Sequence, residues 1–160
     1  MSSAPLSPCP LCASANAPAL WRNDKLRVIA VDDADYPGYV RVIWLAHAAE
    51  MTDLGDADRS LLMQVVCEVE SVMRDHMRPD KVNVAALGNM VPHLHWHIIP
   101  RWRGDRHFPD AIWAPPRVPA GDEPEAFRRM LQDAAGRVPA FHDRLQERLS
   151  VRFGRATCAT

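Results

Sequence analysis

The residues of this chain best suited to chemistry are three histidines at a spacing of two, His93, His95 and His97. A neutral imidazole, with a pKa near about 6.5, can act near neutral pH as base, nucleophile, donor or metal ligand. The residues that alternate with the histidines, Leu94 and Trp96, and the two that follow are apolar. Alternation with a period of two predicts a β-strand with imidazoles on one face and apolar side chains on the other.

This row of histidines suits phosphate chemistry better than a metal site built from all three. Alternate side chains on a strand are about 6.6 Å apart, so the outer two begin about 13 Å apart at their backbones. Zinc holds nitrogen ligands at about 2.0–2.1 Å, so two neighbours can converge on one ion but three in a row fit poorly. The middle histidine, His95, can instead attack an electrophile while its neighbours orient it or donate to the group under attack. An extended anion such as a phosphate fits that arrangement.

A second candidate for chemistry is the pair of thiols in Cys9-Pro10-Leu11-Cys12. This spacing is typical of half a zinc site or of a redox pair, and it also occurs in cysteines that share no role. A redox pair favours a βαβ pattern directly after it, which the following residues do not show. Four cysteines with one close pair do not make a disulfide framework, so we expect a reducing compartment and a cytoplasmic protein.

The bulk composition predicts one compact domain. The chain has 160 residues, of which 48% are hydrophobic, and a formal charge of −1, which suits a substantial core. A near-neutral charge lacks the signature of a nucleic-acid-binding protein. No apolar run approaches the ~18 residues of a membrane-spanning helix, and residues 1–8 lack the pattern of a secretory signal. We therefore expect neither a nucleic acid nor a membrane as a partner.

The elements that must position these residues are short strands and one long helix. Turn residues and β-branched runs predict strands over residues 20–22, 26–31, 39–45 and 82–87, before the histidine strand that ends at Pro100. Residues 56–77 predict a helix, which Pro79 ends. Its apolar face recurs every three or four residues and contains Leu61, Leu62, Val65, Val66, Val69, Val72 and Met73.

The last third of the chain has a different character. Residues 101–119 combine aromatic side chains with several prolines and no periodicity. This pattern predicts an extended loop that packs on its aromatics and covers something. Residues 123–149 predict an amphipathic helix that breaks or kinks between residues 136 and 139.

The histidine strand resembles the histidine-triad (HIT) superfamily. The signature of that superfamily, His-φ-His-φ-His-φ-φ with φ apolar, matches His93-Leu94-His95-Trp96-His97-Ile98-Ile99 without departure. The surrounding run looks closest to bacterial proteins related to the fragile-histidine-triad branch, the diadenosine polyphosphate hydrolases. The supporting segments are Tyr36-Pro37-Gly38-Tyr39-Val40, His47 ahead of Asp53-Leu54, and Gly88-Asn89.

The resemblance implies an α+β, HIT-like fold. We expect an antiparallel sheet of about five strands with a long helix packed on it, a C-terminal helical extension, and a homodimer. Residues 20–101 would form the domain core, residues 1–19 an N-terminal lead with a possible zinc knuckle, and residues 102–160 a loop and helix extension of the same domain.

The resemblance also implies a reaction at the α-phosphate of a nucleotide derivative, either a dinucleoside polyphosphate or a nucleoside phosphoramidate. A histidine nucleophile splits one hard displacement into two steps through a nucleotidyl-histidine intermediate, from which water releases the nucleoside monophosphate. At the matching positions His95 would be the nucleophile, His97 would bind the phosphate or the leaving oxygen, and His93 would orient His95. We expect an adenine nucleotide as substrate and no organic cofactor.

Further substrate contacts follow from the same resemblance. Asn89 lies where the family has a polar residue near the phosphate, so both Asn89 and His97 would bind the substrate. Asp32 lies where a carboxylate accepts from the ribose hydroxyls, and Asp33 or Asp35 is the alternative. Walls for the base would come from Leu26, Val28 and Ile43.

The family bears on the two thiols as well. Some bacterial members with an N-terminal Cys-x-x-Cys bind one zinc with two further histidines, whose positions here are His47 and His93. The implied structural zinc site is therefore Cys9, Cys12, His47 and His93, a donor set that suits tetrahedral zinc. The metal would hold the beginning of the catalytic strand.

Two other functions stay open at this point, a nucleotide-binding module without turnover and a zinc-dependent hydrolase with an open metal position. The contacts that choose the substrate would come from residues 101–119 or the C-terminal helix. Here Arg101, Arg103, Arg106 and His107 either hold a polyphosphate or form a solvated basic loop.

Overall fold

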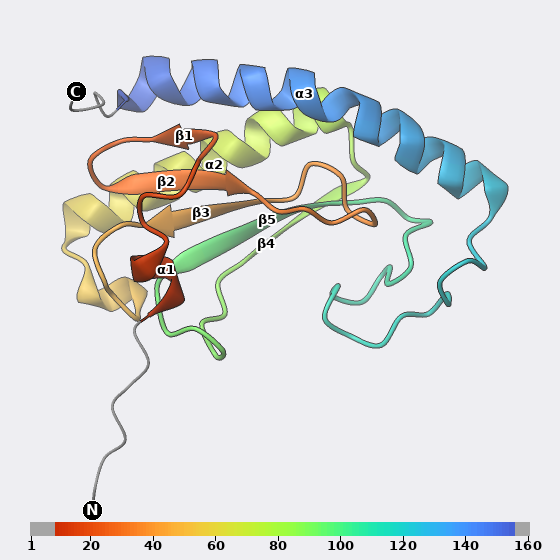
Figure 1. Ribbon diagram of the computed structural model, residues 1–160, viewed down its shortest axis with the longest axis horizontal. Helices are drawn as coiled ribbons and strands as arrows, with labels where there is room; N and C mark the ends of the chain where they lie inside the picture. Colours follow the sequence, from red (N-terminus) through yellow and green to blue (C-terminus); the bar gives the residue numbers. More distant parts are fainter. Residues whose placement is uncertain (1–8, 156–160) are drawn as a thin grey trace, which may run out of the picture.

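A five-stranded antiparallel sheet forms the centre of the computed structural model, which describes residues 9–155 (Figure 1). Its strand order is β1-β2-β3-β5-β4. The strands are β1 (Trp21–Arg22), β2 (Leu26–Ala30), β3 (Val40–Trp44), β4 (Lys81–Ala85) and β5 (His95–Arg101). The predicted α+β fold is confirmed, and β5, the histidine strand, lies between two partners.

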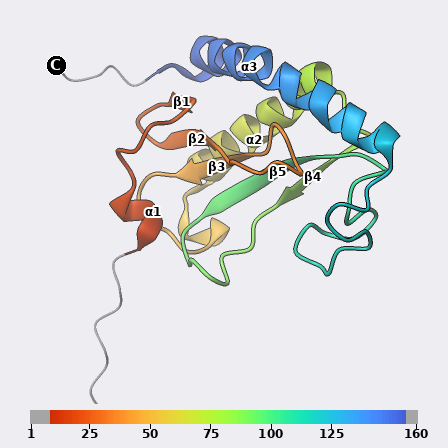
Figure 2. The ribbon, with the colours of Figure 1, turned by 45° about the vertical axis from the view of Figure 1, so that its right-hand side comes forward.

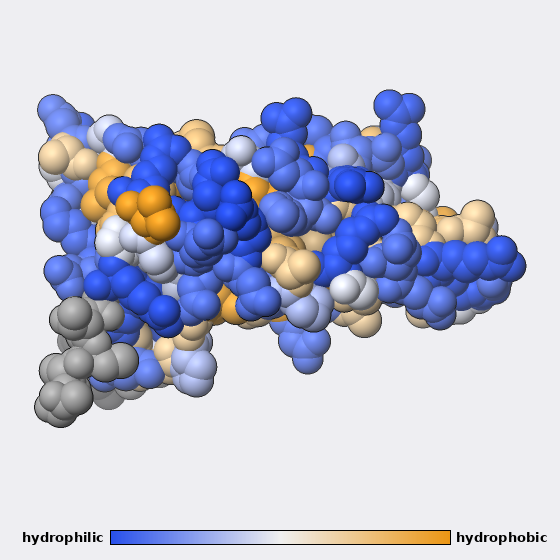
Figure 3. All heavy atoms as spheres, turned by 90° about the horizontal axis from the view of Figure 1, so that it is seen from above, coloured by the Kyte–Doolittle hydropathy of each residue, from blue (hydrophilic) through white to orange (hydrophobic). Residues whose placement is uncertain are grey.

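Two long helices pack on one face of this sheet. Helix α2 (Asp56–Met77) lies on the strands, and α3 (Glu125–Phe153) packs against α2 and β1 (Figure 2). The short helices α1 (Pro10–Ala13) and η1 (Met51–Asp53) lie outside this pair. Seen from the α3 side, the surface is mainly hydrophilic (Figure 3). None of the helices within residues 9–155 is long and apolar enough to cross a membrane.

Alternation along the strands decides which side chains enter the core. On β3, Val40, Val42 and Trp44 are buried with the helices, so Arg41 and Ile43 lie on the opposite face. On β5 the same rule sends Trp96 and Ile98 toward the helices and leaves His95 and His97 on the other face. The sheet therefore has an apolar helix-covered face and a second face that carries the histidines.

One prediction about the second face is wrong. Leu26 and Val28 do not line a base pocket, because both are fully buried in the helix-covered core, where Val28 pairs with Val42. Ile43 does lie on the histidine face, directly opposite His95 across the pair β3–β5. Parity along β2 therefore places Arg27 and Ile29 on the histidine face.

Helix α3 is anchored by ion pairs to a buried carboxylate. Glu68 of α2 is 3% exposed and accepts from Arg148 at 2.5 Å and from Arg152. Phe141, Leu145 and Leu149 add an apolar face. Of the two outcomes predicted for residues 136–139, a break or a kink, the break does not occur, since α3 continues through Pro139. Its axis changes direction near the middle (Figure 1), as a proline within a helix would produce.

The long loop after β5 is organised by one buried aspartate, Asp105. Its carboxylate accepts from Arg101 Nε at 2.6 Å and Nη2 at 2.9 Å, and from the backbone amides of Trp102, His107 and Phe108. Arg101 is only 1% exposed. It is therefore neither a polyphosphate ligand nor part of a solvated basic loop.

Two more of the loop's basic side chains serve to attach it to the rest of the domain. Arg106 pairs with Asp35 at 2.7 Å and with Glu123 at 3.4 Å. His107 Nδ1 is hydrogen-bonded to the Tyr36 hydroxyl at 2.5 Å. The loop is thus held at several points along its length, as expected of a segment that covers part of the sheet.

Candidate functional site

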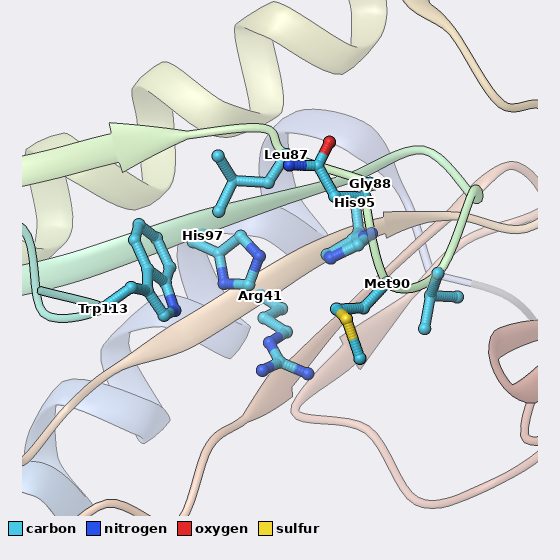
Figure 4. Close-up of a pocket in the computed structure, with 9 residues that line it drawn as sticks. Arg41, Leu87, Gly88, Met90, His95, His97 and Trp113 are labelled. Carbon is cyan, nitrogen blue, oxygen red and sulfur yellow. The ribbon is translucent and has the colours of Figure 1, made fainter.

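A pocket of about 350 Å³ lies on the histidine face, beside the start of β5 (Figure 4). Residues 87–91 form one wall, and Trp113 of the long loop forms another. Gly88 has a φ of +78°, a conformation that favours glycine, and turns the chain just after β4. The side chains of His95, His97 and Arg41 also line this pocket. Strand β5, the two loops and β3 therefore meet at one place.

The hydrogen bond of His95 determines which of its nitrogens is protonated. Its Nδ1 lies 2.6 Å from the backbone carbonyl of His93. A carbonyl only accepts, so Nδ1 carries the proton and the neutral ring has its lone pair on Nε2. The side chain is 8% exposed and lines the pocket. The ring is thus held as a base or nucleophile at Nε2.

His97 lies next along the strand, with its ring centroid 4.8 Å from that of His95. Its Nδ1 is hydrogen-bonded to the buried hydroxyl of Tyr39. Burial, followed by the positive charge of Arg41 and by the neighbouring imidazole of His95, lowers the pKa of His97 to about 4. Burial also raises the pKa of Tyr39, so the hydroxyl keeps its proton. A Tyr39 hydroxyl that donates to Nδ1 leaves His97 Nε2–H as a donor for an anion.

His93 takes a different direction from the other two. It precedes β5, and its amide donates to the carbonyl of Val91 at 2.8 Å across Pro92, a tight turn for which the proline ring suits the backbone angle. His93 Nε2 donates to the carbonyl of Trp44 at 2.6 Å. Its Nδ1 therefore holds the lone pair, and it faces the N-terminal cysteines.

Four side chains gather at His93 in a cluster that can hold a metal ion. Their ligand atoms lie within 4.8 Å of one another and belong to Cys9, Cys12, His47 and His93. His93 Nδ1 is 3.4 Å from both sulfurs, and His47 Nδ1 is 3.4 Å from Cys12 Sγ. Zinc–sulfur and zinc–nitrogen bonds of about 2.3 and 2.0 Å at tetrahedral angles put two ligands about 3.5 Å apart. The donor set and its spacing fit zinc.

Buried Arg27 explains how the two thiols reach this place. Cys9 is the N-cap residue of α1, and Cys12 lies within the helix. Arg27, on the histidine face of β2 and 1% exposed, donates to the carbonyl of Leu11 at 3.2 Å and to that of Ser14. Satisfying the last carbonyls of α1 in this way docks the short helix on the sheet.

The predicted substrate contacts are divided between the pocket and its surroundings. Asn89 lines the pocket together with His95 and His97. Asp32 follows the end of β2, is exposed, and is not one of the lining residues. Of the two alternatives at this loop, Asp35 is used in the ion pair with Arg106, and Asp33 accepts from the backbone amide of Asp35 at 3.0 Å.

Arg41 and Trp113 line the pocket although neither is among the predicted site residues. Arg41 lies on β3 opposite His97, and the alternation of the predicted strand already put odd-numbered side chains of this segment on one face. Trp113 contacts His97 edge to face, with ring centroids 5.2 Å apart. Nothing in the local sequence of a proline-rich loop identifies which aromatic turns back to the sheet.

The chain belongs to the HIT domain family, whose sequence model matches residues 14–104. Among solved structures it is similar to a histidine triad protein from Marinobacter aquaeolei VT8, with 29% identity and a TM-score of 0.64, over 85% of this chain and 93% of that one. A histidine triad protein from Bradyrhizobium japonicum shows 27% identity and a TM-score of 0.57, over 75% and 89%.

Two further relatives are more distant or more partial. A Zn-bound histidine triad family protein from Mycobacterium smegmatis has 23% identity and a TM-score of 0.52, over 82% of this chain and 96% of that one, a likeness of fold. AP-4-A phosphorylase of Mycobacterium tuberculosis (strain ATCC 25618 / H37Rv) is 33% identical over 78 residues, which are 45% of this chain and 40% of the relative. The match thus spans about two fifths of that curated relative.

Proposed function

We propose that this protein is a nucleotidyl hydrolase or transferase that acts at the α-phosphate of a nucleotide derivative. The derivative is a dinucleoside polyphosphate or a nucleoside phosphoramidate, and the nucleotidyl group is carried on His95. The observation that supports this most directly is the bond from His95 Nδ1 to the His93 carbonyl at 2.6 Å. It leaves Nε2 unprotonated beside the pocket, as a nucleophile requires.

The proposed reaction has two displacements. In the first, the lone pair of His95 Nε2 forms a bond to the α-phosphorus, and the bond from phosphorus to the leaving oxygen or nitrogen breaks. The leaving group departs with that electron pair, and a leaving nitrogen also takes a proton from solvent. In the second, water attacks phosphorus and the P–N bond to His95 breaks. The products are a nucleoside monophosphate and a regenerated neutral imidazole, with the remaining proton of the water released to solvent.

The neighbouring groups have matching roles in this proposal. His97 Nε2–H donates to a phosphate oxygen or to the leaving oxygen, and its neutral ring avoids repelling the positive charge that forms on His95. Asn89 offers an amide donor from the same pocket wall. The His93 carbonyl stabilises the cationic His95 ring by accepting a hydrogen bond from its Nδ1–H. Asp32, which lies beyond the pocket, would accept hydrogen bonds from the ribose hydroxyls.

Zinc has a structural role in the proposal. Cys9, Cys12, His47 and His93 would hold the ion, and four protein ligands complete a tetrahedral site without an open position. When bound, the ion supplies a rigid cross-link between α1 and the segment before β5. The His93 carbonyl on which His95 depends is then fixed in place, as outer contacts of a metal ligand often are. The Zn-bound relative from Mycobacterium smegmatis supports this assignment at the level of the fold.

The known relatives support the nucleotide chemistry. The family match covers the segment that contains all three histidines. The partly similar relative from Mycobacterium tuberculosis is named for action on a dinucleoside tetraphosphate. That name also suggests inorganic phosphate as an acceptor in place of water, in which case a nucleoside diphosphate is released.

The central test is the identity of the nucleophile. Wild type and His95→Ala are incubated with diadenosine tetraphosphate and with adenosine phosphoramidate, with and without inorganic phosphate. The wild type should release AMP, or ADP where phosphate is the acceptor. His95→Ala should lose at least about a thousandfold in kcat while keeping its zinc and its melting temperature. Alkaline quenching followed by mass spectrometry should find an adenylyl group on the wild-type peptide that contains His95.

His76→Ala is the matched control, since His76 lies in the last turn of α2 and does not line the pocket. Wild-type rates in His95→Ala would exclude His95 as the nucleophile. AMP binding by calorimetry without turnover of either substrate would indicate a nucleotide-binding module instead.

We also propose that the protein forms a homodimer. Strand β4 is an edge of the sheet, and an unpaired edge can be extended by a second copy. Leu87, which follows β4, is 51% exposed. Light scattering after size exclusion should give the mass of two chains, and the mass of one chain at micromolar concentration would contradict the proposal.

A further inference from the structure

Several residues that line the pocket have no role in the two proposed displacements. Three of its lining residues are large, exposed hydrophobics: Leu87 at 51%, Met90 at 94% and Trp113 at 49%. Beside them lies Arg41, the one lining residue with a permanent charge. A binding site with a fixed cation and an exposed aromatic ring suits a ligand that has both an anionic part and a flat apolar part.

Arg41 has unused capacity for binding. Within residues 9–155 no carboxylate forms an ion pair with it. Its Nε is buried and has no hydrogen-bond partner in the part of the chain that the structure describes. Its guanidinium carbon lies 5.8 Å from the centroid of the Tyr39 ring, which supports the side chain from one side. A buried donor without a partner is costly, so a ligand that accepts from it gains affinity.

The position of Arg41 relative to the nucleophile is informative. Arg41 pairs with His97, whereas Ile43 occupies the place opposite His95. On the histidine face, Arg41 is therefore the side chain next to Ile43 along β3, two residues away from the position opposite His95. It lies on the side of Trp113, which contacts His97. In Figure 4 the Arg41 side chain lies between Trp113 and Met90, below the two imidazoles. Asp32, the proposed ribose contact, does not line this pocket, which leaves the pocket for the other end of the substrate.

We propose that Arg41 and Trp113 are specificity-determining residues that form a subsite for the leaving group. Arg41 binds the phosphate that departs, and Trp113 stacks on an aromatic base at its far end. The inference rests on the proposed nucleotidyl chemistry and deepens it. It states that the subsite favours a polyphosphate leaving group with a second base over an uncharged amine.

The chemistry of the step supports this choice. Breaking the bond to a polyphosphate leaves an additional negative charge on the departing oxygen, whereas a departing amine becomes neutral after it takes a proton. His97 is neutral at pH 7 and contributes only a hydrogen bond. A fixed guanidinium stabilises the developing charge directly and binds phosphate through two parallel bonds.

The test uses three substrates that share adenosine and the α-phosphate. Diadenosine tetraphosphate has an anionic leaving group with a second base, adenosine tetraphosphate has the anion without the base, and adenosine phosphoramidate has neither. Arg41→Gln should lower kcat/KM about a hundredfold for both tetraphosphates. The value for the phosphoramidate should change less than about threefold. Arg41→Lys keeps the charge without the planar fork and should lose about tenfold on the tetraphosphates only.

Trp113 is tested on the pair of tetraphosphates. Trp113→Ala should lower kcat/KM about tenfold more for diadenosine tetraphosphate than for adenosine tetraphosphate, because base stacking on an aromatic ring is lost. Trp113→Phe should retain most of the preference. Arg74→Gln is the matched control, since Arg74 is an exposed arginine of α2 outside the pocket. Zinc content and melting temperature are measured for every variant.

The outcomes separate the two levels of the proposal. An equal loss on all three substrates in Arg41→Gln and Arg41→Lys would assign Arg41 to the shared α-phosphate and overturn the leaving-group subsite, while the nucleotidyl function stands. An equal loss on both tetraphosphates in Trp113→Ala would overturn the role of Trp113 for the second base. A wild type that turns over none of the three would overturn the proposed function and the subsite with it.

Discussion

His93 and His97 flank His95 at the same spacing, but the structure uses them in opposite ways. His97 is inside β5, paired with Arg41 on one side and Ala85 on the other, and it lines the pocket. The Tyr39 hydroxyl is hydrogen-bonded to its Nδ1. His93 lies before the strand begins and turns its ring to two sulfurs. The difference shows that one sequence repeat can contribute to two sites when the strand covers only part of it.

The two sites are linked through a single backbone group. The carbonyl of His93 accepts a hydrogen bond from His95 Nδ1. The side chain of His93 is part of the metal cluster. Changes at the His93 end should therefore act first on stability and only indirectly on the reaction. Changes at the His97 end should act on the reaction and leave the metal in place.

The largest effect is expected at the His93 end. The double substitution Cys9→Ser and Cys12→Ser should abolish zinc binding and lower the melting temperature on the order of 10 °C, since a tightly held ion adds about 4 kcal/mol to folding. Metal analysis and calorimetry, with and without a chelator, measure both. Cys67→Ser, at an exposed cysteine of α2, is the control. Unchanged melting of the wild type in a chelator would mean that the cluster holds no structural metal.

The next effect is expected at the His97 end. His97→Ala should lower kcat about a hundredfold, because a donor aimed at the phosphate is lost. Zinc content should match the wild type. Steady-state kinetics and metal analysis on the same preparation provide the measurement. Loss of zinc together with activity would show that the His97 pocket and the metal cluster at His93 depend on each other.

A smaller effect is expected from the hydroxyl behind His97. Tyr39→Phe removes one hydrogen bond and should lower kcat about tenfold or less, while KM stays close to the wild-type value. Tyr36→Phe is a closely matched control, because its hydroxyl bonds to His107 in the long loop. Equal losses in both variants would mean that the effect comes from loosening of the fold.

The smallest effect is expected in the pH dependence of stability. The pKa of His97 is about 4, below its ordinary value of 6.5, mainly because of burial. The unfolded chain therefore binds more protons than the folded protein between these values. The contribution of His97 to stability is complete above pH 6.5 and is lost as the pH falls toward about 4.

Urea unfolding of wild type and His97→Gln, both in a chelator, isolates the contribution of His97 to the free energy of unfolding. The difference between the two proteins should shrink as the pH falls. A difference that stays constant from pH 7 to pH 4.5 would argue against a depressed pKa at His97.

Much of this arrangement could be predicted because its signals are local. Helix α2 has the predicted bounds, Asp56–Met77, since a long apolar stripe with a proline after it leaves little freedom. The predicted strands also agree with those of the structure to within a few residues. The four residues of the metal cluster were named through the family resemblance, and the structure brings them together.

What could not be predicted depends on pairing and on distant partners. Residues 26–31 have apolar side chains at both parities, with Val28 beside Ile29, and Arg27 is the one charged residue among them. The pairing of Val28 with Val42 places the even-numbered side chains in the core. The carboxylates that neutralise Arg106 come from two separate loops, at Asp35 and Glu123. The return of Trp113 to His97 likewise has no local signal.

The buried pair of Arg101 and Asp105 has a consequence for how the chain can be divided. The family match ends at residue 104, between these two partners. A protein truncated at that limit would keep all three histidines but leave the Arg101 guanidinium buried without its carboxylate, at a cost of about 3–5 kcal/mol. It would also lose Phe127, Phe141 and Leu145 from the core. The segment that the family model matches is therefore smaller than the unit that folds, and a recombinant fragment must retain α3.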